Sequence, residues 1–426
     1  MPDLTSATPE RLATLRTELE QRYDAFKARG LALDMTRGKP SAAQLDLAVD
    51  LLTLPGAGDF KTAAGVDGRN YGGLEGIPEL REIFSAMLEV PADRILIGGN
   101  SSLTMMHDVI VRALLKGVPG GETPWGKLHE VKMLCPCPGY DRHFSICEHF
   151  GIEMIPVPMN ADGPDMDAVE ELVGEDGFIK GIWCVPKYSN PTGVTFSDAV
   201  VDRLASMKTA APDFRIIWDN AYAEHHLGAN PDPLKEILAA CAAAGNPDRA
   251  LVFASTSKIS FAGSGVSAMA ASADNIADQK KHLSMQTIGP DKINQLRHVR
   301  FFGNIDGVRA HMQKHAAILK PKFDAVDALF TKELGDSGVA VWSKPNGGYF
   351  VNLDVLDGTA TETVRLAGEC GVKLTGAGAT FPYKKDPNDR NIRIAPSLPP
   401  LEEVETAMEV VAVCALLTAV QKLAEG

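Results

Sequence analysis

The sequence lacks any sustained block of lysine and arginine. Its 426 residues hold 42 lysines and arginines against 55 aspartates and glutamates, a formal net charge of −13 at pH 7. Proteins that bind nucleic acid through the phosphate backbone usually present a basic face. The charge therefore argues against a nucleic-acid-binding protein.

Targeting signals and long hydrophobic runs are also missing. The N-terminal sequence MPDLTSATPERLATL has no basic segment followed by an apolar one, so we expect no signal peptide. The longest apolar stretch, residues 408–420, is interrupted by Glu409. It is shorter than the roughly 20 residues that a membrane helix needs. We therefore expect a cytoplasmic protein that does not span a membrane.

Cysteine is scarce and is not spaced for metal binding. There are seven cysteines, and no second Cys or His pair follows Cys135 and Cys137 at zinc-site spacing. We expect buried, reduced thiols and no metal site.

The residues that are present alternate between two patterns. From residue 94 to about 258, short β-rich runs separate helical segments, which is typical of a mostly parallel α/β sheet flanked by helices. After about residue 300, a long helix precedes a strand pair around Gly347-Gly348, which indicates a smaller α+β domain. The predicted units are an N-terminal segment of the small domain (1–50), a large domain (51–300) and a small C-terminal domain (301–426).

Polar side chains follow several of the predicted strands, at the end where open α/β sheets bind ligands. They are Ser101 and Ser102 after RILIGGN, Asn190 after GIWCVP, Asp219 and Tyr222 after FRIIW, and Lys258 after ALVFAS. Each feature alone is weak, since a lysine after a strand is usually a surface residue and a Ser-Ser helix start is usually an N-cap. Their combination at one sheet edge favours a shared ligand.

The chemistry of these side chains fits one cofactor. Ser101 and Ser102 at a helix N-terminus suit a phosphate, and the hydroxyls of Ser255 and Ser257 can add donors. Asp219 follows an apolar strand and needs a cation, for which a protonated pyridine nitrogen would serve.

The remaining groups complete the ligand. Asn190 and Tyr222 are donors suited to a phenolic oxygen, and Lys258 can form an imine with an aldehyde. Phosphate, pyridinium, phenolate and aldehyde together describe pyridoxal 5′-phosphate.

Motifs along nearly the whole chain carry a family resemblance: GKP, YGGLEGIPELR, SNPTG, DNAY, STSK, GGYF and RIAPS. The chain resembles the class I (fold-type I) PLP-dependent aminotransferases, and within them the divergent bacterial aspartate aminotransferase subgroup often labelled MocR-like. The resemblance implies that Lys258 binds the cofactor covalently and carries the proton. It also implies that Asp219 holds the pyridine nitrogen, and that Asn190 and Tyr222 hold the 3′-oxygen.

The same resemblance implies further roles. Tyr140 would stack on the ring, and Tyr71 would reach the phosphate in the partner subunit, which implies a homodimer with its active sites at the interface. Arg393 would grip the substrate α-carboxylate, with Gly38 and Asn190 beside it.

One departure concerns the phosphate. The class usually has an arginine several residues beyond the lysine, whereas SKISFAGSGVSAM has none. We expect hydroxyls, backbone N–H groups or a cation from elsewhere to replace it, with Gly263 and Gly265 allowing the backbone to approach.

The resemblance favours L-aspartate:2-oxoglutarate aminotransferase acting by ping-pong transamination on amino-acid and 2-oxo-acid substrates. The alternatives are an aromatic, kynurenine or 2-aminoadipate aminotransferase, a β-lyase, a non-catalytic protein of this fold and, remotely, an aminotransferase-like transcriptional regulator. A dicarboxylic substrate needs a second cation. The candidates are Arg142 first, then Arg37, Arg297 and Arg300, and each could instead be a surface arginine. His143 could lie near the ring or on a helix surface.

Overall fold

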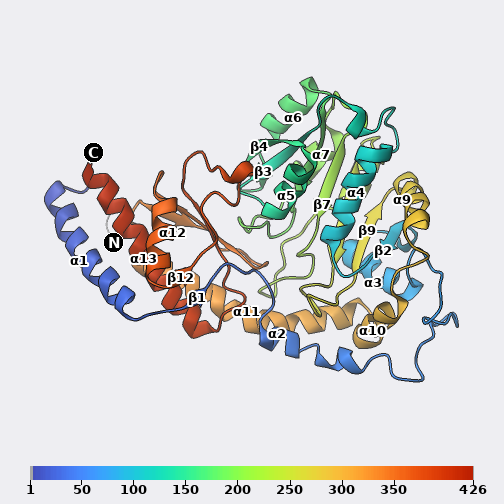
Figure 1. Cartoon of the computed structure of the whole chain (residues 1–426), viewed down its shortest axis with the longest axis horizontal. Helices are drawn as coiled ribbons and strands as arrows, with labels where there is room; N and C mark the ends of the chain where they lie inside the picture. Colours follow the sequence, from blue (N-terminus) through green and yellow to red (C-terminus); the bar gives the residue numbers. More distant parts are fainter. Residues whose placement is uncertain (1–2, 426) are drawn as a thin grey trace.

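The computed structural model describes residues 3–425, and its central feature is an eight-stranded sheet (Figure 1). In sheet order the strands are β2 (Ile95–Ile97), β9 (Ser267–Ala271), β8 (Ala250–Ser255), β7 (Arg215–Asp219), β6 (Ile179–Cys184), β3 (Lys132–Cys137), β4 (Glu153–Asn160) and β5 (Gly163–Pro164). Neighbours from β8 to β4 pair in parallel, and β9 is antiparallel to both β2 and β8. The prediction of a mostly parallel sheet is confirmed.

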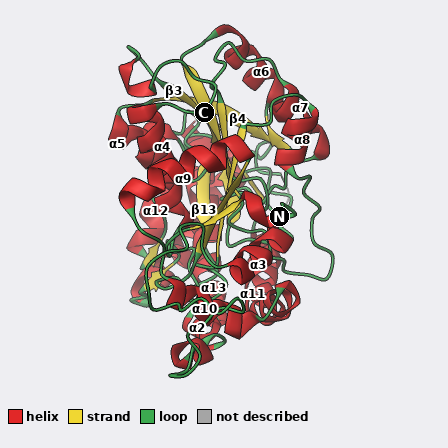
Figure 2. Cartoon of the chain, turned by 90° about the vertical axis from the view of Figure 1, so that its right-hand side faces the viewer, coloured by secondary structure: helices red, strands yellow, loops and turns green. Residues whose placement is uncertain are grey.

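Helices cover both faces of this sheet (Figure 2). On one face lie α4 (Ser102–Lys116), α5 (Asp141–Phe150) and α9 (Ala273–Gln286). On the other lie α3 (Pro78–Leu88), α6 (Met166–Glu175), α7 (Asp198–Ser206), α8 (Ile237–Ala243), α10 (Lys292–Phe302) and the start of α11 (Ile305–Glu333). Because both faces are covered, every residue of β6 and β7 is buried, which explains the apolar runs 181–184 and 216–218 within them.

A second lobe lies to the left in Figure 1. It contains an antiparallel sheet of β10 (Ala340–Trp342), β11 (Val351–Val355) and β13 (Asn391–Ile394), and a parallel pair of β1 (Leu33–Asp34) with β12 (Val372–Lys373). Its helices are α1 (Pro9–Ala28), α12 (Ala360–Glu369) and α13 (Leu401–Glu425). The short helix α2 (Ala42–Asp46) and the 3-10 turns Val49–Thr53, Ala92–Arg94, Trp125–Lys127 and Pro382–Lys384 complete the regular elements of the described chain.

The helix α11 links the two lobes, since it contacts α3 and α10 on one side and α13 on the other. The N-terminal segment belongs with the second lobe by its contacts, because α1 packs on α13 and β1 pairs with β12. The boundaries at 50/51 and 300/301 stay predictions.

The apolar C-terminal stretch corrects one expectation. It forms a single helix of 25 residues, α13, which is long and apolar enough to cross a membrane by length and composition. The helix extends beyond residues 408–420 on both sides, which is why the stretch alone looked too short. However, 72% of its apolar window is buried inside the protein. It therefore has the properties of a core helix. A buried core helix can be as long and as apolar as a membrane helix.

The seven cysteines are all buried and form no disulfide, as expected for reduced thiols.

Candidate active site

A cavity of about 140 Å³ lies at the carboxyl ends of β2, β6, β7 and β8. Ten of the residues predicted for the site line it: Gly38, Ser101, Ser102, Tyr140, Asn190, Asp219, Tyr222, Ser255, Ser257 and Lys258. The prediction that strand-end residues converge at one sheet edge is confirmed.

Lys258 lies in the turn after β8, and its Nζ is 5.2 Å from the centre of the Tyr222 ring. Burial lowers the pKa of the Lys258 ammonium, and the charge of Asp219 partly opposes this shift. A lowered pKa makes more of the neutral amine, which is the form that acts as a nucleophile or a base.

Asp219 ends β7 and is 2% exposed. One carboxylate oxygen, Oδ2, accepts a hydrogen bond from Nε2 of His143 at 3.0 Å. The other oxygen, Oδ1, is buried and has no hydrogen-bond partner among the described residues. A buried carboxylate oxygen left in this state calls for a proton donor or a cation from a ligand.

His143 holds this carboxylate from within the core. It is 1% exposed, stacks on Trp183 with ring centres 4.4 Å apart, and meets the edge of Tyr140 at 4.9 Å. The reading of His143 as a helix-surface residue is therefore wrong. The residue lies on the face of α5 that turns toward the sheet, where its neighbours Phe144 and Cys147 are also buried.

The serines that line the cavity offer hydroxyl donors to an anion, whereas Asp219 offers a carboxylate to a cation. Ser101 is the N-cap residue of α4, but its side chain makes no capping hydrogen bond. The hydroxyl of Ser257 donates to the carbonyl of Asn100 at 2.8 Å, and the hydroxyl oxygen of Ser255 accepts from the N–H of Ser257 at 3.4 Å. The helix N-terminus and the hydroxyl of Ser101 are thus free to bind an anion.

The expected role of the two glycines after the lysine, which is to let the backbone approach the phosphate, stays a prediction. Neither Gly263 nor Gly265 lines the cavity. A Cβ at Gly265 would lie 3.0 Å from the nitrogen of Ser257, so this glycine allows its own turn to pack closely, while Gly263 faces open space. Among the described residues, Lys258 is the one cationic side chain that lines the cavity.

Arg393 approaches the cavity from β13 without lining it. Its Nη1 lies 2.8 Å from Oδ1 of Asp141 and 3.5 Å from Oδ1 of Asn190. Its guanidinium lies 5.0 Å from the centre of the Phe350 ring, and its Nε is buried with no partner in the described chain. Arg393 thus retains a free donor next to two residues that line the cavity.

The other predicted arginines do not line the cavity. Arg37 and Arg142 are exposed, and Nε of Arg297 donates to the carbonyl of Leu54 at 2.9 Å. Arg300 pairs with both carboxylate oxygens of Asp59, at 2.6 and 2.8 Å, so its charge is already compensated. Tyr71 is 81% exposed and likewise lies outside the cavity lining.

Sequence reasoning missed the apolar wall of the cavity. The wall residues are Leu103, Met106, Val185, Ala221 and Phe350. Phe350 had a signal, because it belongs to the GGYF motif. A Cβ at Gly38 would overlap the far end of the Phe350 ring, so a larger residue at this position would displace that ring.

Comparisons with known proteins agree with this geometry. The aspartate aminotransferase family matches residues 7–426. An aspartate aminotransferase of Corynebacterium glutamicum is 52% identical over 415 residues, which cover 97% of this chain and 96% of that protein. A Mycolicibacterium smegmatis protein named only provisionally as an aminotransferase is 55% identical, with 95% of this chain and 96% of that protein covered.

A solved structure extends the likeness to three dimensions. The crystal structure of an aspartate transaminase from C. glutamicum superposes with a TM-score of 0.97 at 51% identity, covering 99% of both chains. None of these likenesses supports the MocR-like label for the subgroup. They do bear out the fold-type I resemblance, and the chain belongs to the aspartate aminotransferase family and is a transaminase.

Proposed function

We propose that the protein is a pyridoxal 5′-phosphate-dependent L-aspartate:2-oxoglutarate aminotransferase that works by a ping-pong mechanism. The observation that carries the proposal is the buried Asp219 carboxylate, whose Oδ1 has no partner, in one small cavity with Lys258 and the start of α4. The 52% identical relative named as an aspartate aminotransferase supports the choice of substrate.

The residues present fit this cofactor. Asp219 would hold the pyridine nitrogen through Oδ1, which otherwise stays unsatisfied. Asn190 and Tyr222 would hold the 3′-oxygen, Tyr140 would cover the ring, and the phosphate would lie at the start of α4. Its binding groups there would be Ser101, Ser102, Ser255 and Ser257. When bound, the cofactor supplies a carbonyl that takes up the amino group and a ring that withdraws electrons from it.

The chain's own residues would then do two kinds of work. Lys258, freed by the incoming amino acid, would take the proton from the substrate Cα, and its lowered pKa suits it to act as that base near neutral pH. His143 would fix the Asp219 carboxylate in place by its hydrogen bond to Oδ2.

Substrate binding would divide between two positions. Arg393 would bind the α-carboxylate, since its Nε is buried without a partner and Asn190 lies beside it. Arg142 is our proposal for the distal carboxylate, because it is exposed and lies two positions after Tyr140, which lines the cavity, at the start of α5.

The proposal includes a cytoplasmic homodimer with Tyr71 reaching the partner's active site. Large exposed apolar side chains support it. Tyr71, in the loop before α3, is 81% exposed. Met285 at the end of α9 and Ile288 just after that helix are 85% and 62% exposed. Burial of such residues between two copies would stabilise a dimer.

The test is the visible absorption of the purified protein, before and after adding L-aspartate and then 2-oxoglutarate. A cofactor band that bleaches with aspartate and returns with 2-oxoglutarate is the expected result. A band that responds instead to an aromatic amino acid, kynurenine or 2-aminoadipate would replace the proposed substrate. Absence of a band after addition of cofactor would overturn the role of Lys258.

A further inference from the structure

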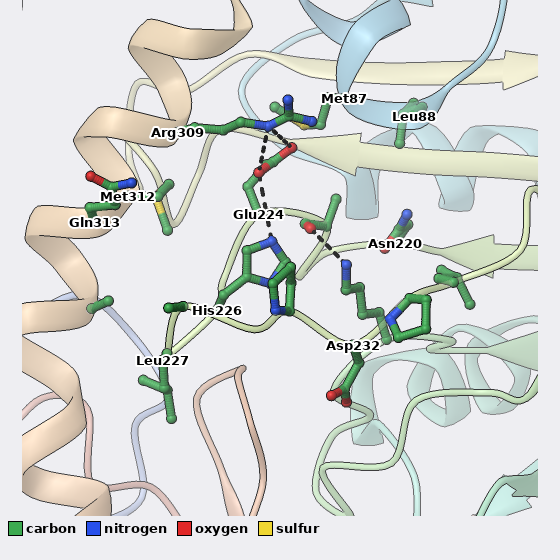
Figure 3. Close-up of a pocket in the computed structure, with 18 of the residues that line it drawn as sticks. Met87, Leu88, Asn220, Glu224, His226, Leu227, Asp232, Arg309, Met312 and Gln313 are labelled. Carbon is green, nitrogen blue, oxygen red and sulfur yellow. Dashed lines mark hydrogen bonds and ion pairs between the residues drawn. The ribbon is translucent and has the colours of Figure 1, made fainter.

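A second and larger cavity, of about 950 Å³, lies on the α11 side of the sheet (Figure 3). Trp218 of β7 and Val252 of β8 line it from the sheet, Met87 and Leu88 from the end of α3, and Met312 from α11. It shares no lining residue with the 140 Å³ cavity at Lys258. Its volume falls within the roughly 300–1,000 Å³ typical of small-molecule sites.

Most charged side chains in this cavity already have partners within the chain. Glu224, which is 5% exposed, lies 3.3 Å from Nε of Arg309 and 3.7 Å from Nε2 of His226 (Figure 3). The other partnered groups are Lys320 with Asp324, Lys235 with Asp202, Asp232 with Thr195 and Asn346, and Glu236 with the N-terminus of α8.

The exceptions in the described chain are Glu89, which is exposed, and Lys187. Lys187 is half-buried in the loop after β6, and its Nζ donates one hydrogen bond, to the carbonyl of Ala223 at 3.3 Å. Within residues 3–425 it has no carboxylate at ion-pair distance. An ammonium carries three donors, so two remain for a ligand in the cavity. Burial lowers the pKa of Lys187, and the charges of Glu224, Asp232 and Glu89 partly oppose this shift.

The remaining wall defines what else the ligand needs. The side chains from α3, β7, β8 and α11 named above are apolar and large, so they favour an aromatic or branched apolar body. Five carboxylates also line the cavity: Glu89, Glu224, Asp232, Glu236 and Asp324. With one free cation against these acids, a second negative charge on the ligand is disfavoured. Dicarboxylates and phosphate esters therefore fit poorly.

We propose that this cavity is a second ligand site, which binds a small monocarboxylate with an aromatic or branched apolar body, its carboxylate held by Lys187. The site is independent of the proposed transamination, since its ligand differs in charge from aspartate and 2-oxoglutarate.

The probe for this site is 4-(trifluoromethyl)benzoate, followed by fluorine NMR on the cofactor-loaded protein. Saturating maleate keeps the dicarboxylate site occupied throughout. The neutral isostere 4-(trifluoromethyl)benzamide reports the contribution of the carboxylate. We expect the benzoate to bind at least about tenfold more tightly than the benzamide, as one charge-assisted hydrogen bond would give.

Two variants locate the binding. Lys187→Met should bring the affinities of the two probes together, whereas Lys314→Met, an exposed lysine of α11 outside the cavity, should leave them apart. Ala316→Trp places a large ring in the cavity and should abolish binding of both probes. Thermal unfolding and transaminase activity of each variant show that it is folded.

Three results would overturn the proposal. They are no binding of the benzoate in the millimolar range, equal affinity for the two probes in the native protein, and unchanged affinity in Lys187→Met.

Discussion

The two cavities meet at neighbouring residues of one strand end, and they differ in size and in chemistry. Asp219 lines the cavity of about 140 Å³, and Asn220 lines the cavity of about 950 Å³. The small cavity gathers a carboxylate with an unpaired oxygen, a lysine of lowered pKa and an uncapped helix start. The large one neutralises nearly all of its charges internally. A cavity is suited to catalysis when unsatisfied polar groups converge in it. A large cavity volume alone indicates at most a ligand-binding site.

The largest expected effect separates the two lysines. Lys258→Ala should lower kcat/KM for L-aspartate by at least about four orders of magnitude, because it removes both nucleophile and base. Lys187→Met should change it by less than about threefold. Steady-state kinetics on the two variants measure this. Comparable losses in both would break the distinction between a catalytic and a binding cavity.

The next comparison uses the neighbouring residues Asp219 and Asn220. Asp219→Asn keeps the size of the side chain but loses the charge, and kcat should fall by about 10²–10³-fold. Asn220→Ser is the matched control, and it should be nearly silent because Oδ1 of Asn220 has no partner in the described chain. An active Asp219→Asn protein would contradict the role of this carboxylate.

A smaller effect is expected at two glycines. Gly38→Ala would push its Cβ into the Phe350 ring, so KM for aspartate should rise by about tenfold as the cavity wall moves. Gly263→Ala meets nothing within 4 Å and should leave KM unchanged. Similar KM values in the two variants would show that Gly38 does not shape the substrate position.

The smallest effect is a pH dependence of stability at His298. His298 is fully buried, bonded to Ser260 at 2.8 Å, and burial lowers its pKa to about 4 from 6.5. Between these values the unfolded chain binds the proton and the folded one does not, so stability falls as pH drops through this window.

For His298 this loss should be about 1 kcal/mol between pH 7.5 and 5.5. His298→Gln should reduce the pH slope of the unfolding free energy, measured with urea, by that amount. An unchanged slope would mean that His298 is protonated in both states or in neither.

Much of the site could be predicted because parallel strands end at one edge. Asn190, Asp219, Tyr222 and Lys258 each follow a strand that apolar runs identify, so their convergence needed no knowledge of side-chain packing. The state of Asp219 could not be predicted in this way. Its hydrogen bond to His143 depends on which face of α5 meets the sheet.

Other features were beyond reach for physical reasons. The strand β9 reads SAMAA, small residues with weak strand propensity, and it was missed because burial between β2 and β8 stabilises it. The large cavity is built from α3, the loop after β6 and α11, which are far apart in sequence. No local sequence pattern predicts that these segments pack around one cavity.

The contact of α1 with α13 and of β1 with β12 has a consequence for biosynthesis. The eight-stranded sheet needs residues 95–271 alone for its pairing, so it can form while the rest of the chain is still on the ribosome. The second lobe cannot complete its packing until its last helix, α13, has been synthesised. Until α13 is released, the apolar faces of α11 and α12 lack their cover, and a nascent chain stalled there would be a natural client for chaperones.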